Sequence, residues 1–377
     1  MDISYWEKNT FFDKLDITII GSGIVGLSAA LALKKQAPKL KILVLERGIL
    51  PTGASSKNAG FACFGSPGEL LEDLKTHTEH ELFTLVEKRW KGLLKLRKKL
   101  GDHAIDFNNW GGYEIFDHTP HFDQCADQLN YLNKQLLPIT GKQNTYKIAD
   151  AEIKHFGFQS IRHMIVNTEE GQIDTGKMMH SLIALARTQG IEILNGIEIL
   201  KLEEETHRIR LTTASGLDLQ STQVIIATNG FARQLLPDLA VQPARAQVLI
   251  TNPLKQLKFK GTFHYTNGYY YFRNIGNRVL LGGGRNLDFH AEETALFGLT
   301  PLVQNKLDEL LKKMILPQTD YTIAMRWSGI MGLGTEKTTI VKAISKNIFC
   351  AVRMGGMGIS IGSLIGEEVA ALALQHR

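Results

Sequence analysis

The stretch DITIIGSGIVGLSAALALKKQAPKLKILVLERGILPTGASSKNAG, residues 16–60, decides the fold. It opens with the apolar, β-branched residues of a buried strand and then reaches Gly21-Ser22-Gly23-Ile24-Val25-Gly26, a G-x-G-x-x-G motif. Gly21 permits a tight turn, Gly23 lets the backbone approach a pyrophosphate, and Gly26 lets the next helix lie close to the strand. The spacing therefore predicts a strand, a turn and a helix whose N-terminus faces an anion.

A second apolar strand over residues 41–45 ends at Glu46. An acid at this distance from the glycine turn meets a ribose hydroxyl, and its charge would repel a 2′-phosphate. A glycine-rich turn in an unrelated α/β domain is the alternative. The preceding strand, the following helix and the acid together favour an adenine dinucleotide site, with Gly21, Gly23, Ile24, Val25, Gly26 and Glu46 as binding residues.

The composition is that of a globular protein with a substantial core. The chain has 377 residues, of which 44% are hydrophobic and 21% charged, and this length favours two domains with a discontinuous boundary. The net charge of +5 is mildly basic, and the densest basic run, residues 95–99, fits the solvated face of a helix. Nucleic-acid binding needs a concentrated basic stripe and is not expected.

The cysteines and the N-terminus bear on location. Cys63, Cys125 and Cys350 lie far apart and form no C-x-x-C motif, which favours a reducing, cytoplasmic setting. The first residues, MDISYWEKNTFFDKLD, do not resemble a signal peptide, and residues 359–374 are interrupted by Glu367 and Glu368. We expect no transmembrane segment, while peripheral membrane association stays open.

A loop rich in Gly, Ser, Pro and Asn follows Glu46 and should expose many backbone N–H groups. With its GASSKNAGF run, the opening resembles the D-amino acid oxidase superfamily of flavoproteins, which includes glycine oxidase, sarcosine oxidase and the γ-glutamylputrescine oxidoreductases. The resemblance implies that the bound dinucleotide is FAD and that this loop wraps the pyrophosphate and reaches the flavin ring. The residues it assigns to FAD here are Arg47, Gly53, Ala54, Ser55, Ser56, Asn58, Ala59 and Gly60.

Two later segments extend the resemblance to the C-terminus. A helix from Asp174 to Gly190 and a strand over residues 224–226 lead to Ala227-Thr228-Asn229-Gly230. A strand over residues 347–352 then leads through a glycine turn into a helix over residues 360–375, which supplies a second positive helix end. By resemblance the further FAD residues are Ala227, Thr228, Asn229, Gly355, Gly356, Met357 and Gly358.

The intervening segments predict the rest of the fold. Residues 69–100 have helical periodicity, residues 110–116 fit a strand, and residues 242–321 fit a sheet with a helix over residues 302–314. The expected fold is α/β, or α+β overall, with a Rossmann-type FAD-binding domain and a discontinuous antiparallel-sheet substrate domain. We assign residues 1–75, 152–240 and 325–377 to the FAD-binding domain, and residues 76–151 and 241–324 to the substrate domain.

Candidate substrate residues lie on the predicted sheet. They are Tyr269, Tyr270, Tyr271, Arg273, Arg285, Trp327 and Met331, although aromatic residues on a strand are more often core residues. In glycine oxidase and D-amino acid oxidase, a W-x-G-x-R type of pattern supplies an Arg that clamps the substrate carboxylate. Met331 stands at that place here and cannot do so. Either Arg273 or Arg285 replaces it, or the substrate is no simple α-amino acid.

Some relatives tether the flavin covalently, through a His beside the loop or a Cys near the Trp327 segment. This chain has Lys57 and Asn58 beside the loop and no Cys near Trp327, so we expect non-covalent FAD and no metal. The resemblance implies oxidation of a C–N bond in an amine or amino acid by hydride transfer to flavin N5, with the electron acceptor undetermined. The alternatives are a 2-hydroxy-acid dehydrogenase and a flavin-binding subunit without substrate chemistry; a nicotinamide enzyme is disfavoured.

Overall fold

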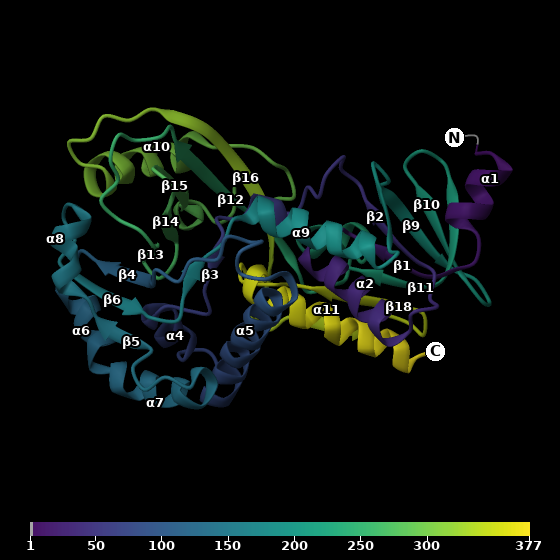
Figure 1. Ribbon diagram of the computed structural model, residues 1–377, viewed down its shortest axis with the longest axis horizontal. Helices are drawn as coiled ribbons and strands as arrows, with labels where there is room; N and C mark the ends of the chain where they lie inside the picture. The colour runs from purple at the N-terminus through teal and green to yellow at the C-terminus, as the bar shows by residue number, and fades with distance from the viewer. Residues whose placement is uncertain (1–2) are drawn as a thin grey trace.

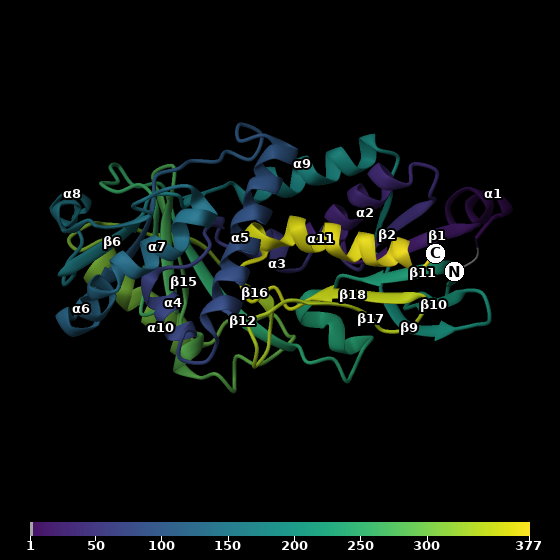
Figure 2. The same ribbon diagram turned by 90° about the horizontal axis from the view of Figure 1, so that it is seen from below.

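The computed structural model describes residues 3–377, which form two eight-stranded sheets and one two-stranded sheet. The two large sheets lie at opposite ends of an elongated molecule, with the N- and C-termini both at the end that holds the first sheet (Figure 1). Seen from below, helices α2, α5, α9 and α11 lie above the strands of that sheet (Figure 2).

The first sheet has a parallel centre that begins with the predicted motif. Its central strands are hydrophobic and buried because helices cover them, as parallel strands require. The order is β17-β18-β11-β1-β2-β8; β10 also pairs with β11, and β9 pairs with β10. The parallel strands are β1 (Leu15–Ile20), β2 (Ile42–Glu46), β8 (Glu192–Asn195), β11 (Asp218–Ile226) and β18 (Ile348–Val352), and the antiparallel additions are β9 (Ile199–Glu204), β10 (Ile209–Thr213) and β17 (Ile340–Ala343).

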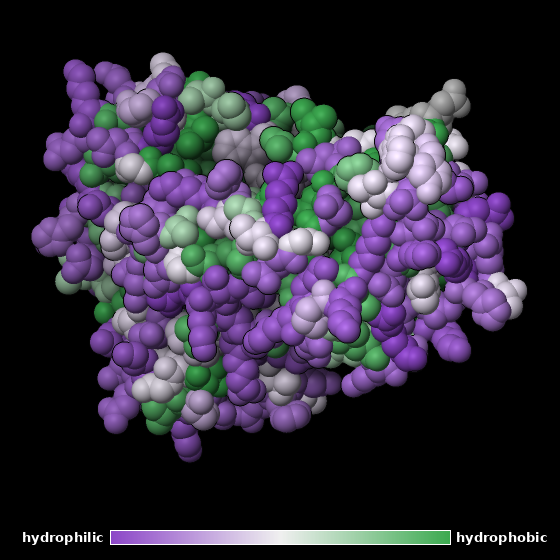
Figure 3. All heavy atoms as spheres, turned by 45° about the vertical axis from the view of Figure 1, so that its right-hand side comes forward, coloured by the Kyte–Doolittle hydropathy of each residue, from purple (hydrophilic) through white to green (hydrophobic). Residues whose placement is uncertain are grey.

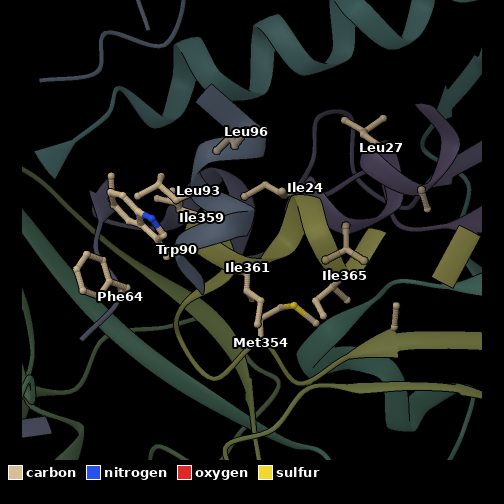
Figure 4. Packing of buried hydrophobic residues seen from close by; sticks show 14 of the residues in the cluster. Ile24, Leu27, Phe64, Trp90, Leu93, Leu96, Met354, Ile359, Ile361 and Ile365 are labelled. Carbon is tan, nitrogen blue, oxygen red and sulfur yellow. The ribbon is translucent and has the colours of Figure 1, made fainter. Parts of the chain in front are cut away.

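Small residues let three helices cross closely over this sheet. These helices are α2 (Ile24–Gln36), α5 (Glu79–Leu100) and α11 (Gly358–Gln375). A Cβ on Gly366 would lie 2.6 Å from the Ser28 Cβ, so α11 can approach α2 only through glycine. Apolar side chains from all three helices pack at this junction, as Figure 4 shows for Ile24, Leu27, Trp90, Leu93, Leu96, Ile359, Ile361 and Ile365.

The second sheet is mostly antiparallel, as predicted, and contains one parallel pair, β4 with β13. This exception arises because the chain passes through the first sheet between these two strands. The order is β16 (Ile323–Leu333), β12 (Gln242–Thr251), β15 (Arg278–Gly283), β14 (Tyr270–Ile275), β13 (Thr262–Tyr265), β4 (Gly112–Phe116), β6 (His163–Asn167) and β5 (Tyr146–Ile148).

The two faces of the second sheet have different neighbours. Phe263 and Phe272 stack at 4.7 Å between ring centroids and lie with Tyr270 in a separate core, against α10 (Pro301–Leu310) and the following turn. Side chains alternate along a strand, so Tyr269 and Tyr271 point to the opposite face. Tyr270 is therefore a core residue and, unlike Tyr269 and Tyr271, does not line the cavity described below.

The remaining elements connect these layers. Figure 3 shows one face of the molecule, on which hydrophilic side chains predominate. No described helix is long and apolar enough to cross a membrane. The other elements are α1 (Tyr5–Glu7), a π-helix (Lys8–Phe12), α3 (Ala54–Lys57), β3 (Phe61–Ala62), α4 (Pro67–Asp73), α6 (Thr119–Asp127), α7 (Leu129–Thr140), α8 (Ile153–Phe156), β7 (Gly171–Gln172), α9 (Thr175–Thr188), a second π-helix (Leu311–Ile315) and 3₁₀ turns at Asp150–Glu152, Asn229–Gln234 and Arg285–Leu287.

The structure differs from the predicted boundaries in three places. The helix expected over residues 69–100 is two helices, because Thr78 and Glu81 form a capping box that starts α5 anew. Strands β6 and β16 both belong to the second sheet, in which β6 pairs with β4 and β16 pairs with β12. The predicted boundaries place residues 152–240 and 325–377 in the FAD-binding domain. Conversely, α5 packs in the core of the first sheet. Periodicity predicts an element but not the sheet it joins.

Candidate cofactor and substrate site

A cavity of about 680 Å³ lies between the two large sheets and draws its lining from both. The first sheet contributes the glycine turn, Glu46 and the two loops that follow β11 and β18. The second sheet contributes the face that carries His264, Tyr271 and Val248. The cavity therefore joins a dinucleotide-binding half, residues from the first sheet, to what we call the substrate half, residues from the second sheet and α4.

The glycine turn has the tight geometry that its sequence predicts. A Cβ on Gly26 would lie 1.9 Å from the Gly21 carbonyl oxygen, and Gly21 has a φ of +106°. A Cβ on Gly23 would lie 2.8 Å from the Ser55 hydroxyl oxygen, which accepts a hydrogen bond from the Ile24 backbone N–H. Gly21, Gly23, Ile24 and Val25 line the cavity, while Gly26 lies behind it and sets the approach of α2.

Glu46 is buried at the end of β2 and lines the cavity. One carboxylate oxygen accepts from the Ser22 hydroxyl at 2.9 Å, and the other accepts from the Thr52 hydroxyl at 2.9 Å and the Gly48 N–H at 3.1 Å. These donors fix the orientation of the carboxylate next to the glycine turn. The backbone N–H groups of Ser22 and Thr52 also donate to it, at 3.2 and 3.4 Å, so a ribose hydroxyl would share acceptor sites that are already in use.

The loop over residues 53–60 is held by its own side chains. The Asn58 amide donates to the carbonyls of Ala54 and Ser55, and its oxygen accepts from the Gly60 N–H and the Thr175 hydroxyl. The Ser56 hydroxyl donates to the Pro51 carbonyl and does not line the cavity. Ser56 therefore shapes the loop, whereas Arg47, Gly53, Ala54, Ser55, Asn58, Ala59 and Gly60 lie on the cavity wall.

The turns after β11 and β18 meet at Asn229. The Asn229 side-chain oxygen accepts from the backbone N–H groups of Arg353 and Met354, at 3.0 and 3.2 Å. Gly355 and Gly356 have φ values of +60° and +81°, which a residue with a Cβ rarely adopts. This link brings the N-terminus of α11 to the cavity, where Ala227, Thr228, Asn229, Gly355, Gly356, Met357 and Gly358 are wall residues.

These features fit FAD. Neither α2 nor α11 has a side-chain hydrogen bond from its N-cap residue, and the positive ends of both helices face the cavity. The Thr228 hydroxyl is buried there without a hydrogen-bond partner among the described residues. A phosphate and a flavin carbonyl oxygen are the kinds of acceptors that such groups bind.

Arg273 does not line the cavity. Its guanidinium Nη1 donates to the carbonyls of Gly60 and Ile173, at 2.8 and 2.7 Å, and burial lowers its pKa to about 10. It therefore joins the second sheet to the loop over residues 53–60. Arg273 is not placed to bind the substrate carboxylate in place of the arginine that is absent at Met331. Trp327 has a comparable structural role, since its indole N–H donates to the Lys57 carbonyl.

Arg285 and Met331 do line the cavity. The Arg285 guanidinium lies 4.7 Å from the centroid of the Phe289 ring and forms no ion pair with any described residue. Met331 lies near Gly356, whose Cβ would be 3.7 Å from the Met331 sulfur. Of the two arginines considered, only Arg285 is placed to bind a substrate anion.

The sequence did not predict that a buried histidine, His264, lies on the cavity wall. His264 lines the cavity with 5% of its surface exposed, and its Nε2 lies 3.7 Å from a carboxylate oxygen of Glu170. Burial alone would lower the His264 pKa, but Glu170 and Glu69 outweigh it and raise the pKa to about 9. Burial raises the pKa of the neighbouring Glu114 to about 7. Only the pairing of β4 with β13 brings Glu114 opposite His264, and that register carries no local sequence signal.

Cys63 is buried at the cavity wall, with its sulfur 3.7 Å from the Met357 sulfur. Burial raises its thiol pKa well above the usual value, so the thiol stays protonated at neutral pH. The three cysteines are all buried and unpaired.

The fold and cavity define a dinucleotide-binding protein with a second sheet closing over the ligand. The sequence matches the DAO family, described as FAD dependent oxidoreductase, over residues 16–372, and the chain belongs to that family. It is 23% identical to the probable oxidoreductase OrdL of Haemophilus influenzae, covering 97% of this chain and 84% of that protein. It is 22% identical to a D-amino acid dehydrogenase of Helicobacter pylori, and the alignment covers 96% of this chain and 95% of that protein.

Solved structures show the same fold. Glycine oxidase from Bacillus cereus has a TM-score of 0.76 at 17% identity, covering 97% of this chain and 96% of that one. L-proline dehydrogenase from P. horikoshii has a TM-score of 0.75 at 17% identity, covering 96% and 94%. These likenesses confirm the predicted combination of a Rossmann-type sheet and a second sheet.

Proposed function

We propose that the protein binds FAD non-covalently and oxidises a C–N bond of a small amine or amino acid. The observation that carries the proposal is the cavity itself, where two positive helix ends face a tyrosine- and arginine-bearing sheet. Relatives named as D-amino acid dehydrogenase, glycine oxidase and L-proline dehydrogenase support the substrate class.

Each half of the cavity has a distinct task in this proposal. The N-terminus of α2 binds the pyrophosphate, Glu46 accepts a ribose hydroxyl, and the N-terminus of α11 lies where the flavin carries negative charge. When bound, FAD would supply a two-electron acceptor: the substrate C–H bond would give up a hydride while the nitrogen lone pair forms the C=N bond of a protonated imine. Tyr271 and Phe61 form apolar walls that exclude water from the reacting carbon.

The first experiment records the visible spectrum of the purified protein before and after anaerobic addition of amines, amino acids and 2-hydroxy acids. Bleaching of the flavin bands by amines or amino acids is expected. Bleaching by hydroxy acids alone would replace this function with 2-hydroxy-acid dehydrogenation. Bands that no small molecule bleaches, in a protein that co-purifies with a partner, would instead favour a flavin-binding subunit.

Non-covalent binding has its own test. Among the described residues, no cysteine or histidine lies in the loop over residues 53–60, and the one nearby thiol, Cys63, is held protonated. Acid precipitation should therefore release the flavin into the supernatant, and a yellow pellet would contradict the proposal. We also propose a cytoplasmic location, in which the three buried thiols stay reduced, and cell fractionation tests it.

A further inference from the structure

The substrate half of the cavity contains charged groups of both signs that no described residue neutralises. Its positive group is Arg285, which rests on the Phe289 ring and has no carboxylate within ion-pair distance among residues 3–377. Two lysines also line the cavity: Lys337 is paired with Asp73, and Lys57 belongs to the loop of the dinucleotide-binding half. An anionic group entering the substrate half would therefore find Arg285 as its available partner.

The negative group is Glu69 on α4. One of its oxygens accepts from the Ser66 backbone N–H, and the other lies against Gly268, on the cavity wall. No lysine or arginine lies within ion-pair distance of Glu69 in the part of the chain that the structure describes. Among the neighbouring charges, Glu72 pairs with Lys75, while the His264 cation lies 3.7 Å from Glu170 and also interacts with Glu69.

A second observation at this place calls for a hydrogen-bond donor. The Asn267 side-chain oxygen is buried without a partner among the described residues, and Asn267 lines the cavity next to Gly268. A buried acceptor is costly unless it meets a donor, and an ammonium or guanidinium group supplies several.

The two charged places lie near the same end of the sheet. Glu69 lies against Gly268, in the turn that joins β13 to β14, and Arg285 follows Gly284, whose N–H donates to the Tyr269 carbonyl. Neighbouring strands lie about 4.8 Å apart, so one extended molecule can reach from Arg285 to Glu69.

We propose that the substrate is an amino acid with a second, cationic amino or guanidino group at the far end of its side chain. Arg285 binds the carboxylate, and Glu69 binds the terminal cation together with Asn267. The chain of the substrate crosses Tyr271, which leaves the carbon that carries the amine at the flavin side of the cavity. This inference rests on the proposed function and narrows its substrate class.

The test uses the purified holoprotein and measures anaerobic flavin reduction by both enantiomers of lysine, ornithine and arginine. The neutral comparison is norleucine, the anionic comparison is glutamate, and cadaverine provides the terminal cation without a carboxylate. The ratio of reduction rate to dissociation constant should be at least about tenfold higher for a cationic amino acid than for norleucine, because a charged hydrogen bond contributes about 1.5–3 kcal/mol. Cadaverine should fall below the cationic amino acid by a similar factor.

Two variants separate the binding role of Glu69 from its role in the helix. Glu69→Gln keeps the capping-box geometry of α4 but removes the charge. It should lower the ratio of reduction rate to dissociation constant about tenfold for the cationic amino acid. The same ratio for norleucine should stay within about twofold of the wild-type value. Glu81→Gln is the matched control, because Glu81 has the same capping position in α5 and does not line the cavity.

The outcomes distinguish this inference from the proposed function. If no amine or amino acid reduces the flavin, the function itself fails. If norleucine or glutamate reduces it as well as the cationic amino acids do, the function stands and the inference is wrong. The inference is also wrong if Glu69→Gln slows cationic and neutral substrates equally, or if Glu81→Gln has the same effect.

Discussion

The two halves of the cavity are built by different means. In the dinucleotide-binding half the backbone makes the site, through the glycine turn at Gly21 and the N-termini of α2 and α11. In the substrate half side chains make it, from the face of a sheet whose strands come from distant parts of the chain. The first half can hold a cofactor shared by many proteins, while the second can change its charges without changing the fold.

This difference has a consequence for substitutions. A Cβ in the glycine turn meets backbone atoms that cannot move without moving the sheet. A substitution on the substrate face meets side chains and open cavity, so it alters binding more than folding. Replacements in the two halves should therefore fail in different ways, and three of them test that contrast.

The largest effect is expected from Gly26→Ala. The new Cβ would lie 1.9 Å from the Gly21 carbonyl oxygen, so α2 must move away from β1 and from the pyrophosphate site. We expect loss of FAD and a destabilisation of more than about 4 kcal/mol, the range of severe core disruptions. The ratio of flavin to protein absorbance and the unfolding midpoint measure the two effects.

Gly53→Ala is the matched control in the same half. No atom lies within 4 Å of the position that its Cβ would take, and its φ of −75° is allowed for any residue. It should keep its stability, because the added Cβ meets no protein atom. If Gly26→Ala also kept its stability and its FAD, the close approach of backbone would not be what forms this half of the site.

The next effect concerns a buried ion pair of the second sheet that does not line the cavity. Glu292 is 1% exposed and pairs with Arg245 at 2.7 Å, while its other oxygen accepts from Gln247 and Thr300. The pair holds the segment that follows Arg285 against β12. Glu292→Ala leaves Arg245 without its partner and should cost about 3–5 kcal/mol.

Urea unfolding of holoprotein tests this expectation, together with the flavin content. The folded fraction should keep its FAD, because the lost contacts belong to the second sheet. Glu309→Ala removes exposed ion pairs with Lys306 and Lys313 and should change the stability by less than about 1 kcal/mol. Equal losses in the two variants would show that the Glu292 network does not anchor the segment.

The contrast also explains what the sequence could predict. The fold and the dinucleotide-binding half of the cavity could be predicted from local patterns, since Gly21 to Gly26 and the strand ending at Glu46 lie within one supersecondary unit. His264, Glu69 and Glu114 have no such pattern, because they meet only through the pairing of β4 with β13 and the position of α4. The same limit affects Arg273, whose partners Gly60 and Ile173 lie on distant segments.

The smallest effect is expected in the change of the unfolding free energy with pH that His264 causes. Its pKa is raised to about 9 in the folded protein, against about 6.5 for an unperturbed histidine. The stabilisation from its charged form is thus fully present below about pH 6.5 and is lost as the pH rises to about 9. Each pKa unit corresponds to about 1.4 kcal/mol, so the loss is no more than about 3.5 kcal/mol.

His264→Gln should remove this loss, so that its unfolding free energy changes less than that of the wild type between about pH 6.5 and 9. Glu114, whose pKa is raised to about 7, acts mainly at lower pH and is present in both proteins. The matched control is His118→Gln, since the His118 side chain is 78% exposed. Parallel pH profiles for wild type and His264→Gln would show that His264 does not lose a proton between about pH 6.5 and 9 in the folded protein, which would contradict the raised pKa.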